Sequence, residues 1–298
     1  MKAPSSPPLR ALLMTALSPL FAACTVGTLN AIIPSDGYRS QTNVAYGPDP
    51  RQRLDVHVPV AAAPADGRPV AVWIYGGSWQ SGARGDYAFI ADTLAALGWI
   101  TVIPDYRLFP EVRFPAFVED TAQAVAWTRS EQARDILGPT NGTLVLMGHS
   151  AGAYNAAMVA YDPQWLRAAR ADPAMVSGFV GLAGPYNLFP YDVEVTKRVF
   201  GHETDPTVVE PLSHITAASP PALLVTGLRD TVVGPYHTDA MEAALAAKGV
   251  GHRTVRLADA NHAGVVLGLT RYFRDKALTV PLAAFLKGLE KPAPRHDG

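Results

Sequence analysis

The sequence predicts an α/β fold in which helices cover both faces of a mostly parallel central sheet. Short continuous apolar segments, such as "RPVAVWIYGG" at 68–77 and "GTLVLMGHS" at 142–150, have the length and composition of strands buried on both faces. Helical segments such as "AGAYNAAMVAY" at 151–161 alternate with these strands along the chain. Because consecutive parallel strands need a crossover connection, this alternation favours one sheet with helices on both sides.

The other elements follow in chain order. An early hairpin is expected from Val44 to Val58, where a Gly-Pro-Asp-Pro turn precedes alternating apolar residues. Strands are then expected at 68–77, 99–106, 142–150, 176–184, 221–230 and 252–258. Helices are expected at 87–98, 117–137, 151–161 and 237–249, with a last one near 272–289. Residues 185–219 have no strong period, and we expect them to form a small insertion near the site.

Length and composition indicate one domain with a large core. The chain has 298 residues, of which 48 % are hydrophobic and 17 % are charged, so it has enough apolar material to fold alone. Its formal net charge is −1 and it has no long run of like charges, which argues against a nucleic-acid partner. The single cysteine, Cys24, excludes an internal disulfide and a cysteine-rich zinc site.

The N-terminus resembles a bacterial export signal. Lys2 and Arg10 precede the apolar run "ALLMTALSPLFAAC" at 11–24, which is too short to span a bilayer comfortably. Its end, "FAAC", is similar to a lipobox, so we expect Cys24 to be lipidated and to become the mature N-terminus. An ordinary cleaved signal and an unprocessed apolar N-terminus are the alternatives.

This interpretation divides the chain into a signal peptide at 1–24, an N-terminal linker at 25–43, an α/β domain at 44–290 and a flexible tail at 291–298. We expect the protein to be exported to the bacterial cell envelope, in the periplasm. Membrane association is expected through a lipid anchor on Cys24. Since one acyl chain binds a membrane only marginally, stable anchoring depends on the several chains of a bacterial lipoprotein.

A nucleophile elbow is predicted around Ser150. The sequence "VLMGHSAGAY" contains G-x-S-x-G at the junction of a predicted strand and a predicted helix. In that context Gly148 and Gly152 leave room for a tight turn that holds the Ser150 hydroxyl clear of the sheet, at a helix N-terminus. The alternative is a glycine-rich turn that carries a solvent-exposed serine.

A serine nucleophile needs a base, and the base needs a carboxylate that orients it. In this arrangement the chain order is Ser, then Asp or Glu, then His. His262 follows a predicted strand in "RLADANHAGVV", so we expect it to be the base rather than a structural loop histidine. Asp230 ends the strand at 221–230, and open α/β sheets place their sites at strand C-termini. Asp259 is the alternative acid, although its closeness to His262 favours a loop-capping role.

The glycines of "WIYGGSWQSG" at 73–82 predict an oxyanion hole. Acyl transfer places negative charge on the carbonyl oxygen, and fixed backbone N–H groups stabilise that charge. Gly76 and Gly77 lack side chains, so backbone N–H groups can approach a substrate there. We expect the donors to be the N–H groups of Gly77, Ser78 and Ala151, and a plain glycine turn is the alternative.

These motifs resemble those of a known family. "YGGSWQSG" is similar to the HGGxW loop of α/β-hydrolases in the hormone-sensitive-lipase-like and bacterial feruloyl esterase-like group, which also includes kynurenine formamidases. "DYRLFPEVRFPAFVED" is similar to the YRLAPE...FPA segment of that group, and "AGPYNL" and "PPALLVTGLRD" are similar to later blocks. The resemblance covers about residues 45–290 and implies an α/β-hydrolase fold with Ser150, Asp230 and His262 as its triad.

One residue departs from the family pattern. Tyr75 stands where the relatives have histidine. That histidine is thought to brace the loop rather than to transfer protons, and we expect the tyrosine hydroxyl to do similar work. Asp105 matches a family block, and we expect its charge to hold loops together.

Three aromatic residues are candidates for a substrate pocket. Trp79, Tyr154 and Tyr186 are placed by the resemblance where they could line an acyl or alcohol pocket. Packing in the core is the alternative for each of them.

Together the motifs predict a serine hydrolase that cleaves short to medium acyl or aryl carboxylic esters through an acyl-enzyme. We expect a small-molecule ester substrate, no cofactor, no catalytic metal and no nucleic-acid partner. The alternatives are an arylformamidase, a small serine peptidase and a non-catalytic binding protein with a hydrolase fold. A non-catalytic relative normally loses a triad member, and this chain keeps all three.

Overall fold

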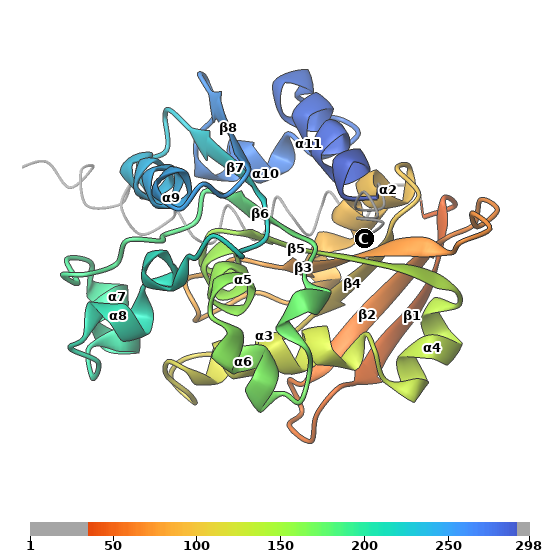
Figure 1. Cartoon of the computed structure of the whole chain (residues 1–298), viewed down its shortest axis with the longest axis horizontal. Helices are drawn as coiled ribbons and strands as arrows, with labels where there is room; N and C mark the ends of the chain where they lie inside the picture. Colours follow the sequence, from red (N-terminus) through yellow and green to blue (C-terminus); the bar gives the residue numbers. More distant parts are fainter. Residues whose placement is uncertain (1–34, 291–298) are drawn as a thin grey trace, which may run out of the picture.

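An eight-stranded sheet forms the centre of the protein (Figure 1). The computed structural model describes residues 35–290, and its strands have the order β1-β2-β4-β3-β5-β6-β7-β8. β1 pairs antiparallel with β2, and β2 pairs antiparallel with β4. All the other neighbouring pairs are parallel. The expected early hairpin and the mostly parallel sheet are therefore confirmed.

Four of the inner strands are buried along their whole length. The strands are β1 Tyr38–Ala45, β2 Arg53–Pro59, β3 Arg68–Ile74, β4 Ile100–Pro104, β5 Thr140–His149, β6 Gly178–Leu182, β7 Ala222–Gly227 and β8 His252–Leu257. Every residue of β3, β4, β6 and β7 is buried, as a strand between two helical layers must be. β1, at the edge, buries only Tyr38 and Val44. This strand includes residues 38–43, which the sequence analysis assigned to the linker.

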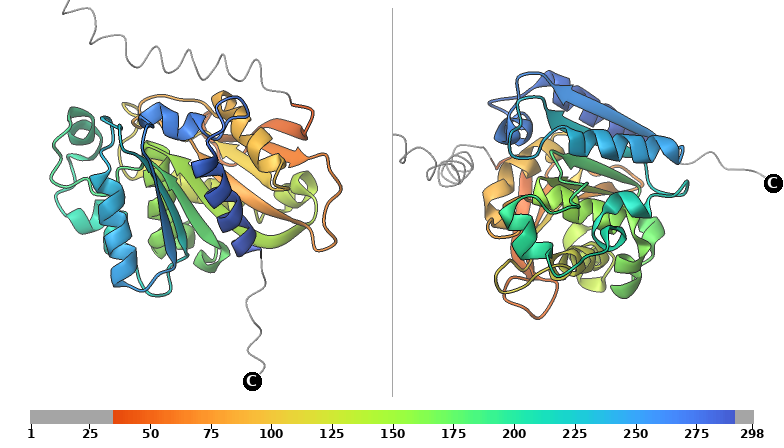
Figure 2. Two further views of the ribbon diagram at one scale, coloured as in Figure 1. Left: turned by 90° about the horizontal axis from the view of Figure 1, so that it is seen from above. Right: turned by 90° about the vertical axis from the view of Figure 1, so that its left-hand side faces the viewer.

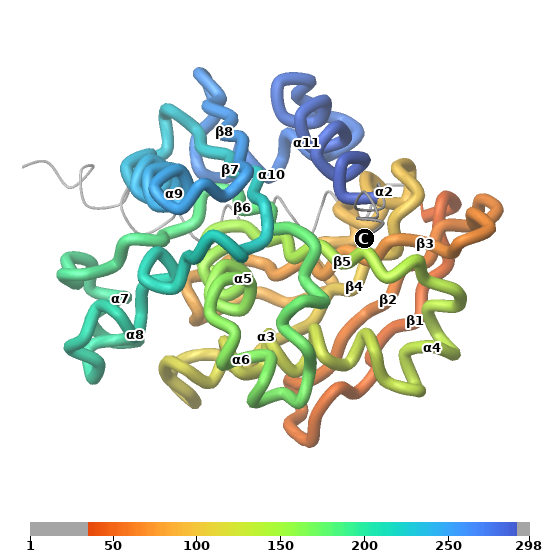
Figure 3. The backbone as a smooth tube through the Cα atoms, in the orientation of Figure 1, coloured from red at the N-terminus to blue at the C-terminus, as the bar shows by residue number. Residues whose placement is uncertain are grey.

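Helices and short 3-10 turns connect the strands. The helices are α2 Ala88–Ala95, α3 Ala116–Trp127, α4 Glu131–Leu137, α5 Ala151–Tyr161, α6 Pro163–Ala168, α7 Glu194–Phe200, α8 Pro206–Val209, α9 Tyr236–Ala247, α10 His262–Leu267 and α11 Lys276–Leu289. The 3-10 turns are η1 Arg84–Tyr87, η2 Pro173–Met175 and η3 Pro211–His214. The expected insertion at 185–219 contains α7, α8 and η3, and Figure 3 shows α7 and α8 together at one end of the molecule.

The helices lie on both faces of the sheet (Figure 2). A Cβ atom added at Gly178 in β6 would lie 2.7 Å from the side chain of Leu289 in α11. The next residue, Phe179, packs its ring against Tyr161 at the end of α5, with 5.6 Å between ring centroids. Because successive side chains of a strand point to opposite faces, α11 and α5 cover opposite sides of the sheet.

One expected helix is divided in two. The sequence predicts a continuous helix at 117–137, whereas α3 ends at Trp127 and α4 begins at Glu131. The Ser130 hydroxyl between them accepts a hydrogen bond of 3.1 Å from the Ala133 N–H. A serine at this position satisfies one of the free N–H groups of a helix start, so it favours a new helix. The prediction of a single helix was wrong.

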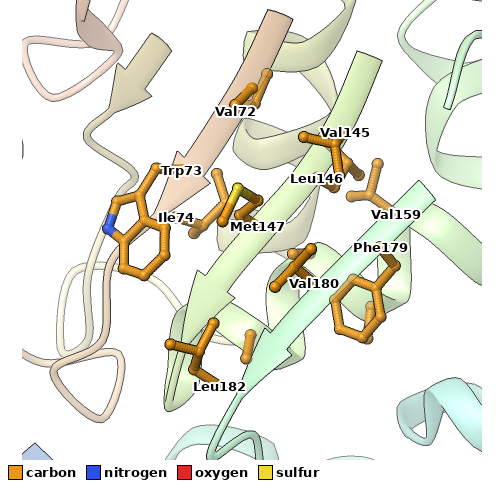
Figure 4. Packing of buried hydrophobic residues seen from close by; sticks show 14 of the residues in the cluster. Val72, Trp73, Ile74, Val145, Leu146, Met147, Val159, Phe179, Val180 and Leu182 are labelled. Atoms are coloured by element: carbon orange, nitrogen blue, oxygen red, sulfur yellow. The ribbon is translucent and has the colours of Figure 1, made fainter. Parts of the chain in front are cut away.

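Apolar side chains of the central strands form the core (Figure 4). Trp73 and Met147 come from β3 and β5, and Val180 comes from β6. All three are fully buried, at 0 % exposure. This packing fixes the C-terminal ends of β3 and β5 relative to one another, and the candidate site lies just beyond those two ends.

The two ends of the chain lie outside the described residues. The signal peptide at 1–24, its lipidated Cys24 and the tail at 291–298 therefore stay predictions. Within residues 35–290, no helix combines the length and the apolar character that crossing a membrane requires.

His57 in β2 makes the stability of the fold depend on pH. Its side chain is 5 % exposed, and burial lowers its pKa to about 4. The unfolded chain protonates this histidine near pH 6.5, so between these two values the unfolded state binds more protons and stability falls as pH falls. We expect wild type to lose about 2 kcal/mol between pH 7 and pH 5 through this group, and His57→Gln to remove that loss. Urea unfolding at both pH values measures it. The exposed His252, changed to Gln, is the control that should keep the wild-type slope, and an equal slope in His57→Gln would contradict the prediction.

Candidate active site

Ser150 lies in a strained turn between β5 and α5. Its backbone has φ 55° and ψ −127°, a conformation that costs energy for any residue other than glycine. A Cβ atom at Gly148 would lie 2.5 Å from the backbone of Gly152, so these two positions of the motif exclude side chains. The Ser150 N–H donates a 2.9 Å hydrogen bond to the Leu182 carbonyl at the end of β6. The predicted G-x-S-x-G motif therefore forms a sharp strand-to-helix turn.

The glycine loop after β3 lies directly against this turn. A Cβ atom at Gly76 would lie 2.9 Å from the Ser150 Cβ and 3.0 Å from the His149 carbonyl oxygen. The next three residues, Gly77, Ser78 and Trp79, have φ values of 127°, 53° and 58°. Positive φ is uncommon for residues other than glycine, so three such residues in a row give this loop an unusual backbone conformation. The loop is thereby held close to the Ser150 side chain.

The three expected oxyanion donors are available. Among residues 35–290, the backbone N–H groups of Gly77, Ser78 and Ala151 donate to no other protein group. Ala151 is the first residue of α5, and the first N–H groups of a helix have no partner within it. Free N–H groups beside a nucleophile can stabilise an oxyanion without reorganising.

Asp230 and His262 form a direct hydrogen bond. The His262 Nδ1–H donates to Asp230 Oδ2 over 2.7 Å, and the Asp230 side chain is fully buried. Asp230 Oδ1 accepts the N–H groups of Val232 and Val233 at 2.8 and 2.9 Å. Burial alone would raise the pKa of Asp230, but the bonds from His262 and these two N–H groups outweigh it and lower the pKa. Since Nδ1 carries the proton of the neutral ring, His262 Nε2 has the lone pair that a base needs.

His149 makes a direct contact with His262. The two imidazole rings lie 4.7 Å apart, and His149 Nε2–H donates to the His262 carbonyl over 3.1 Å. Burial and the nearby His262 lower the pKa of His149 to about 3, so this ring is neutral. His149 directly precedes Ser150 in the motif, so its bond to the His262 carbonyl links the residue next to Ser150 to the Asp230–His262 pair. Sequence reasoning missed this role, although the residue stands inside "GHSAG".

The position of His262 differs from the expected loop. It is the first residue of α10, whose preceding Asn261 accepts a 2.8 Å hydrogen bond from the Gly264 N–H. Asparagine is a strong helix-starting residue, and this short helix was not predicted. The rival acid, Asp259, has a side chain that is 82 % exposed and pairs with Arg229. Its carboxylate faces solvent, whereas that of Asp230 faces His262.

Tyr75 braces the glycine loop through its hydroxyl. This buried residue donates to Asp105 Oδ1 over 2.8 Å and accepts from Arg51 Nη2 over 2.8 Å. Its ring stacks on Tyr106, with 4.8 Å between centroids. The Arg84 guanidinium and its backbone N–H also bind Asp105. These four polar groups form a partly buried network, in which Arg51 and Arg84 were not predicted from the sequence.

A cavity of about 130 Å³ opens beside Ser150. Trp79 is one of its walls, and the Trp79 indole N–H donates to Asn155 Oδ1 over 2.9 Å. Tyr154 and Tyr186 are both 0 % exposed and do not line this cavity. Tyr154 donates instead to the Val209 carbonyl over 2.7 Å, which ties α5 to the insertion. The described part of the chain holds no group of three His, Cys, Asp or Glu arranged to bind a metal ion.

Comparison with known proteins gives the family. Residues 54–245 match the BD-FAE family. The chain belongs to this family. Esterase LipC of Mycobacterium tuberculosis is 30 % identical over 216 residues, which are 66 % of this chain and 52 % of that protein. Esterase LipQ of the same organism is 28 % identical over 282 residues, which are 85 % of this chain and 63 % of that protein. This BD-FAE member thus spans less than two thirds of the length of either relative.

Solved structures confirm the α/β-hydrolase fold of this BD-FAE member. Esterase B from Lactobacillus rhamnosis has a TM-score of 0.75 at 18 % identity, covering 95 % of this chain and 96 % of that chain. A thermophilic esterase from Thermogutta terrifontis, with butyrate bound, has a TM-score of 0.70 at 23 % identity, covering 90 % of this chain and 99 % of that chain. At these identities the likeness concerns the fold alone.

Removing the Tyr75 hydroxyl should have a modest effect. Tyr75→Phe loses the two hydrogen bonds of the hydroxyl, while Arg84 still pairs with Asp105 and the backbone donors stay in place. We therefore expect kcat on a short acyl ester to fall only about 2- to 13-fold. Tyr75→His, which restores the residue of the relatives, should keep measurable activity with the same ester preference. Steady-state kinetics of both variants measure these effects, and thermal melting checks that each variant is folded. A folded Tyr75→Phe as inactive as Ser150→Ala would mean that the hydroxyl acts in the chemistry.

The two acids can be separated by matched substitutions. Asp230→Asn should lower kcat by about 10²- to 10⁴-fold, because an amide cannot hold the imidazolium that forms during the reaction. Asp259→Asn should stay within roughly twofold of wild type, because exposed ion pairs contribute little. Equal losses in the two variants, measured on one ester, would contradict the assignment of Asp230.

Proposed function

We propose that this protein is a serine hydrolase that cleaves carboxylic esters through an acyl-enzyme intermediate. The observation that carries the proposal is the hydrogen-bonded Asp230–His262 pair, which contacts His149, the residue next to a strained Ser150. The free N–H groups of the glycine loop and of Ala151 complete the chemistry that ester cleavage requires. The substrates proposed are esters with short to medium acyl or aryl groups, in keeping with a small cavity at the nucleophile.

In the acylation step, Ser150, His262, Asp230 and the backbone N–H groups each have one role. Ser150 Oγ attacks the ester carbonyl carbon as its proton passes to His262 Nε2, and the carbonyl oxygen becomes an oxyanion. The backbone N–H groups stabilise that oxyanion, and Asp230 stabilises the imidazolium. When the tetrahedral intermediate collapses, the C–O bond to the alcohol breaks and the alcohol takes the proton from His262.

Deacylation repeats the sequence with water. His262 Nε2 takes a proton from the water molecule as its oxygen attacks the acyl carbon of the Ser150 ester. Collapse of the second intermediate returns the proton to Ser150 Oγ and releases the carboxylic acid. The site is then unchanged, so no cofactor enters the balance.

The relatives support this proposal by their names. LipC and LipQ are named as esterases, and so are the two solved structures described above. All three triad residues lie within residues 35–290, which favours an enzyme over a non-catalytic binding protein.

Ser150→Ala should abolish ester hydrolysis while the protein remains folded. Loss of the nucleophile of a triad has lowered kcat by about 10⁶-fold in a serine protease, and we expect at least about 10³-fold here. Hydrolysis of 4-nitrophenyl butyrate and covalent labelling by a fluorophosphonate measure the loss. Ser213→Ala, at an exposed serine outside the cavity wall, is the matched control and should react like wild type.

Two results would count against the proposal. Activity of Ser150→Ala within tenfold of wild type would exclude Ser150 as the nucleophile. Wild-type cleavage of an N-formyl arylamine with no cleavage of any ester would assign the protein to formamide hydrolysis instead.

A further inference from the structure

A second histidine lines the cavity at Ser150 and has no part in the triad. His237 lies in α9 and shares the cavity wall with Ser150 and Ala151. Its side chain is 7 % exposed, so it is almost entirely enclosed by protein. A buried polar side chain at a reaction site calls for an explanation of what its polar atoms bind.

One ring nitrogen of His237 is already bound. The Asn187 backbone N–H donates to His237 Nδ1 over 3.2 Å, so Nδ1 carries a lone pair and no proton. Tyr236 holds the ring from one side, with 4.1 Å between the two ring centroids. Burial lowers the pKa of His237 to about 4, which keeps the ring neutral near pH 7. A neutral imidazole with an unprotonated Nδ1 carries its proton on Nε2.

The other nitrogen is therefore a fixed donor without a partner. His237 Nε2 makes no hydrogen bond with any group of residues 35–290, and the ring borders the cavity. Nε2 is not among the fully buried unpartnered atoms, so it is accessible from the cavity, where a ligand oxygen can accept its hydrogen bond. The structure thus offers an N–H group to whatever part of the substrate occupies the cavity.

The charge of the cavity wall limits which acceptor fits. Among the described residues that line it, Asp192 is the only Asp or Glu, and none is Lys or Arg. Asp192 also acts on His237, since its negative charge opposes the effect of burial on the pKa of that ring. Asp192 is itself exposed, so it would repel a carboxylate or phosphate on the substrate to an extent that salt reduces. An uncharged oxygen would not be repelled.

We propose that His237 is a specificity-determining residue whose Nε2–H donates a hydrogen bond to an uncharged oxygen of the substrate. The substrate class is esters that carry a neutral ether, hydroxyl or carbonyl oxygen a few bonds from the scissile group, in preference to plain hydrocarbon esters and to anionic esters. This inference rests on the proposed ester hydrolysis. The role of His237 is recognition, while His262 remains the base.

The test compares esters in which one methylene becomes an oxygen. On the acyl side the pair is 4-nitrophenyl pentanoate and 4-nitrophenyl 3-methoxypropanoate, with the anionic 4-nitrophenyl monosuccinate as a third substrate. On the alcohol side the pair is butyl acetate and 2-methoxyethyl acetate. An ether oxygen only accepts hydrogen bonds, so each pair isolates a donor of the protein. Comparison of the acyl-side pair with the alcohol-side pair shows whether the acyl group or the alcohol group of the substrate lies in the cavity.

For each pair, we divide kcat/KM for the ether ester by kcat/KM for its methylene counterpart. Comparing this ratio between wild type and a variant cancels the difference in intrinsic reactivity of the two esters. In His237→Phe this ratio should fall about 3- to 10-fold in at least one pair, because a phenyl ring keeps the shape and loses the donor. His237→Gln, whose amide supplies a new N–H donor, should restore part of it. His252→Phe, the same change at an exposed histidine outside the cavity, should keep the wild-type ratio.

A charge test accompanies the donor test. Asp192→Asn should improve the monosuccinate relative to the pentanoate by about 3- to 10-fold at low salt, and less at high salt because salt screens exposed charges. Glu194→Gln, at a carboxylate of α7 that does not line the cavity, is the control. No change in Asp192→Asn would contradict the electrostatic part of the inference.

The outcomes separate this inference from the proposed function. If wild type cleaves esters and the ratios do not depend on residue 237, the recognition role is overturned while the hydrolase stands. If His237→Phe loses activity equally on both members of each pair, His237 serves the chemistry or the fold instead. A second measurement needs no variant: nitrogen NMR of the wild-type ring at pH 7 should show the Nε2–H tautomer, and the Nδ1–H tautomer or an imidazolium would overturn the proposal.

Discussion

The close backbone approach between the end of β3 and the turn after β5 is the constraint on which the rest of the site depends. Ile74 and Gly148 pair in adjacent parallel strands, and a few residues later Gly76 meets Ser150. A methyl group at Gly76, Gly148 or Gly152 would overlap with the opposing backbone or with Ser150. Only glycines therefore allow the loop that carries the N–H donors to lie beside the nucleophile. The buried packing of both strands keeps this approach fixed.

A strained loop needs support from below, and Asp105 supplies it. The carboxylate is 5 % exposed, and a charge so buried is tolerated only with partners. Tyr75 and Arg84 are those partners, and Arg84 also pairs with Asp55 of β2. Through these bonds the antiparallel edge of the sheet is tied to the glycine loop. Tyr75 is thus part of a hydrogen-bond network that supports the loop.

His149, His262 and His237 differ in what their second ring nitrogen does. His149 uses it to bind the His262 backbone, so it positions the base. His262 leaves Nε2 as a lone pair after binding Asp230, so it can take a proton. His237 leaves Nε2 as an N–H after accepting from Asn187, so it can only donate. The same side chain has three functions because its hydrogen-bond partners fix three different proton positions.

The sequence by itself determined the elements whose signals are local. Continuous apolar runs predicted the buried strands, and the spacing of Gly148, Ser150 and Gly152 at a strand-to-helix junction predicted the turn, because strand burial and tight turns depend on neighbouring residues. The tertiary structure decided what depends on distant residues and on side-chain direction. The sequence leaves both Asp230 and Asp259 as candidate partners of His262. The structure distinguishes them, because Asp230 is buried and bonds to His262, whereas Asp259 is exposed and pairs with Arg229. Likewise Tyr154 and Tyr186 point into the core, while His237, which no motif marks, lines the cavity. Helix packing sets those directions, and a one-dimensional pattern does not contain them.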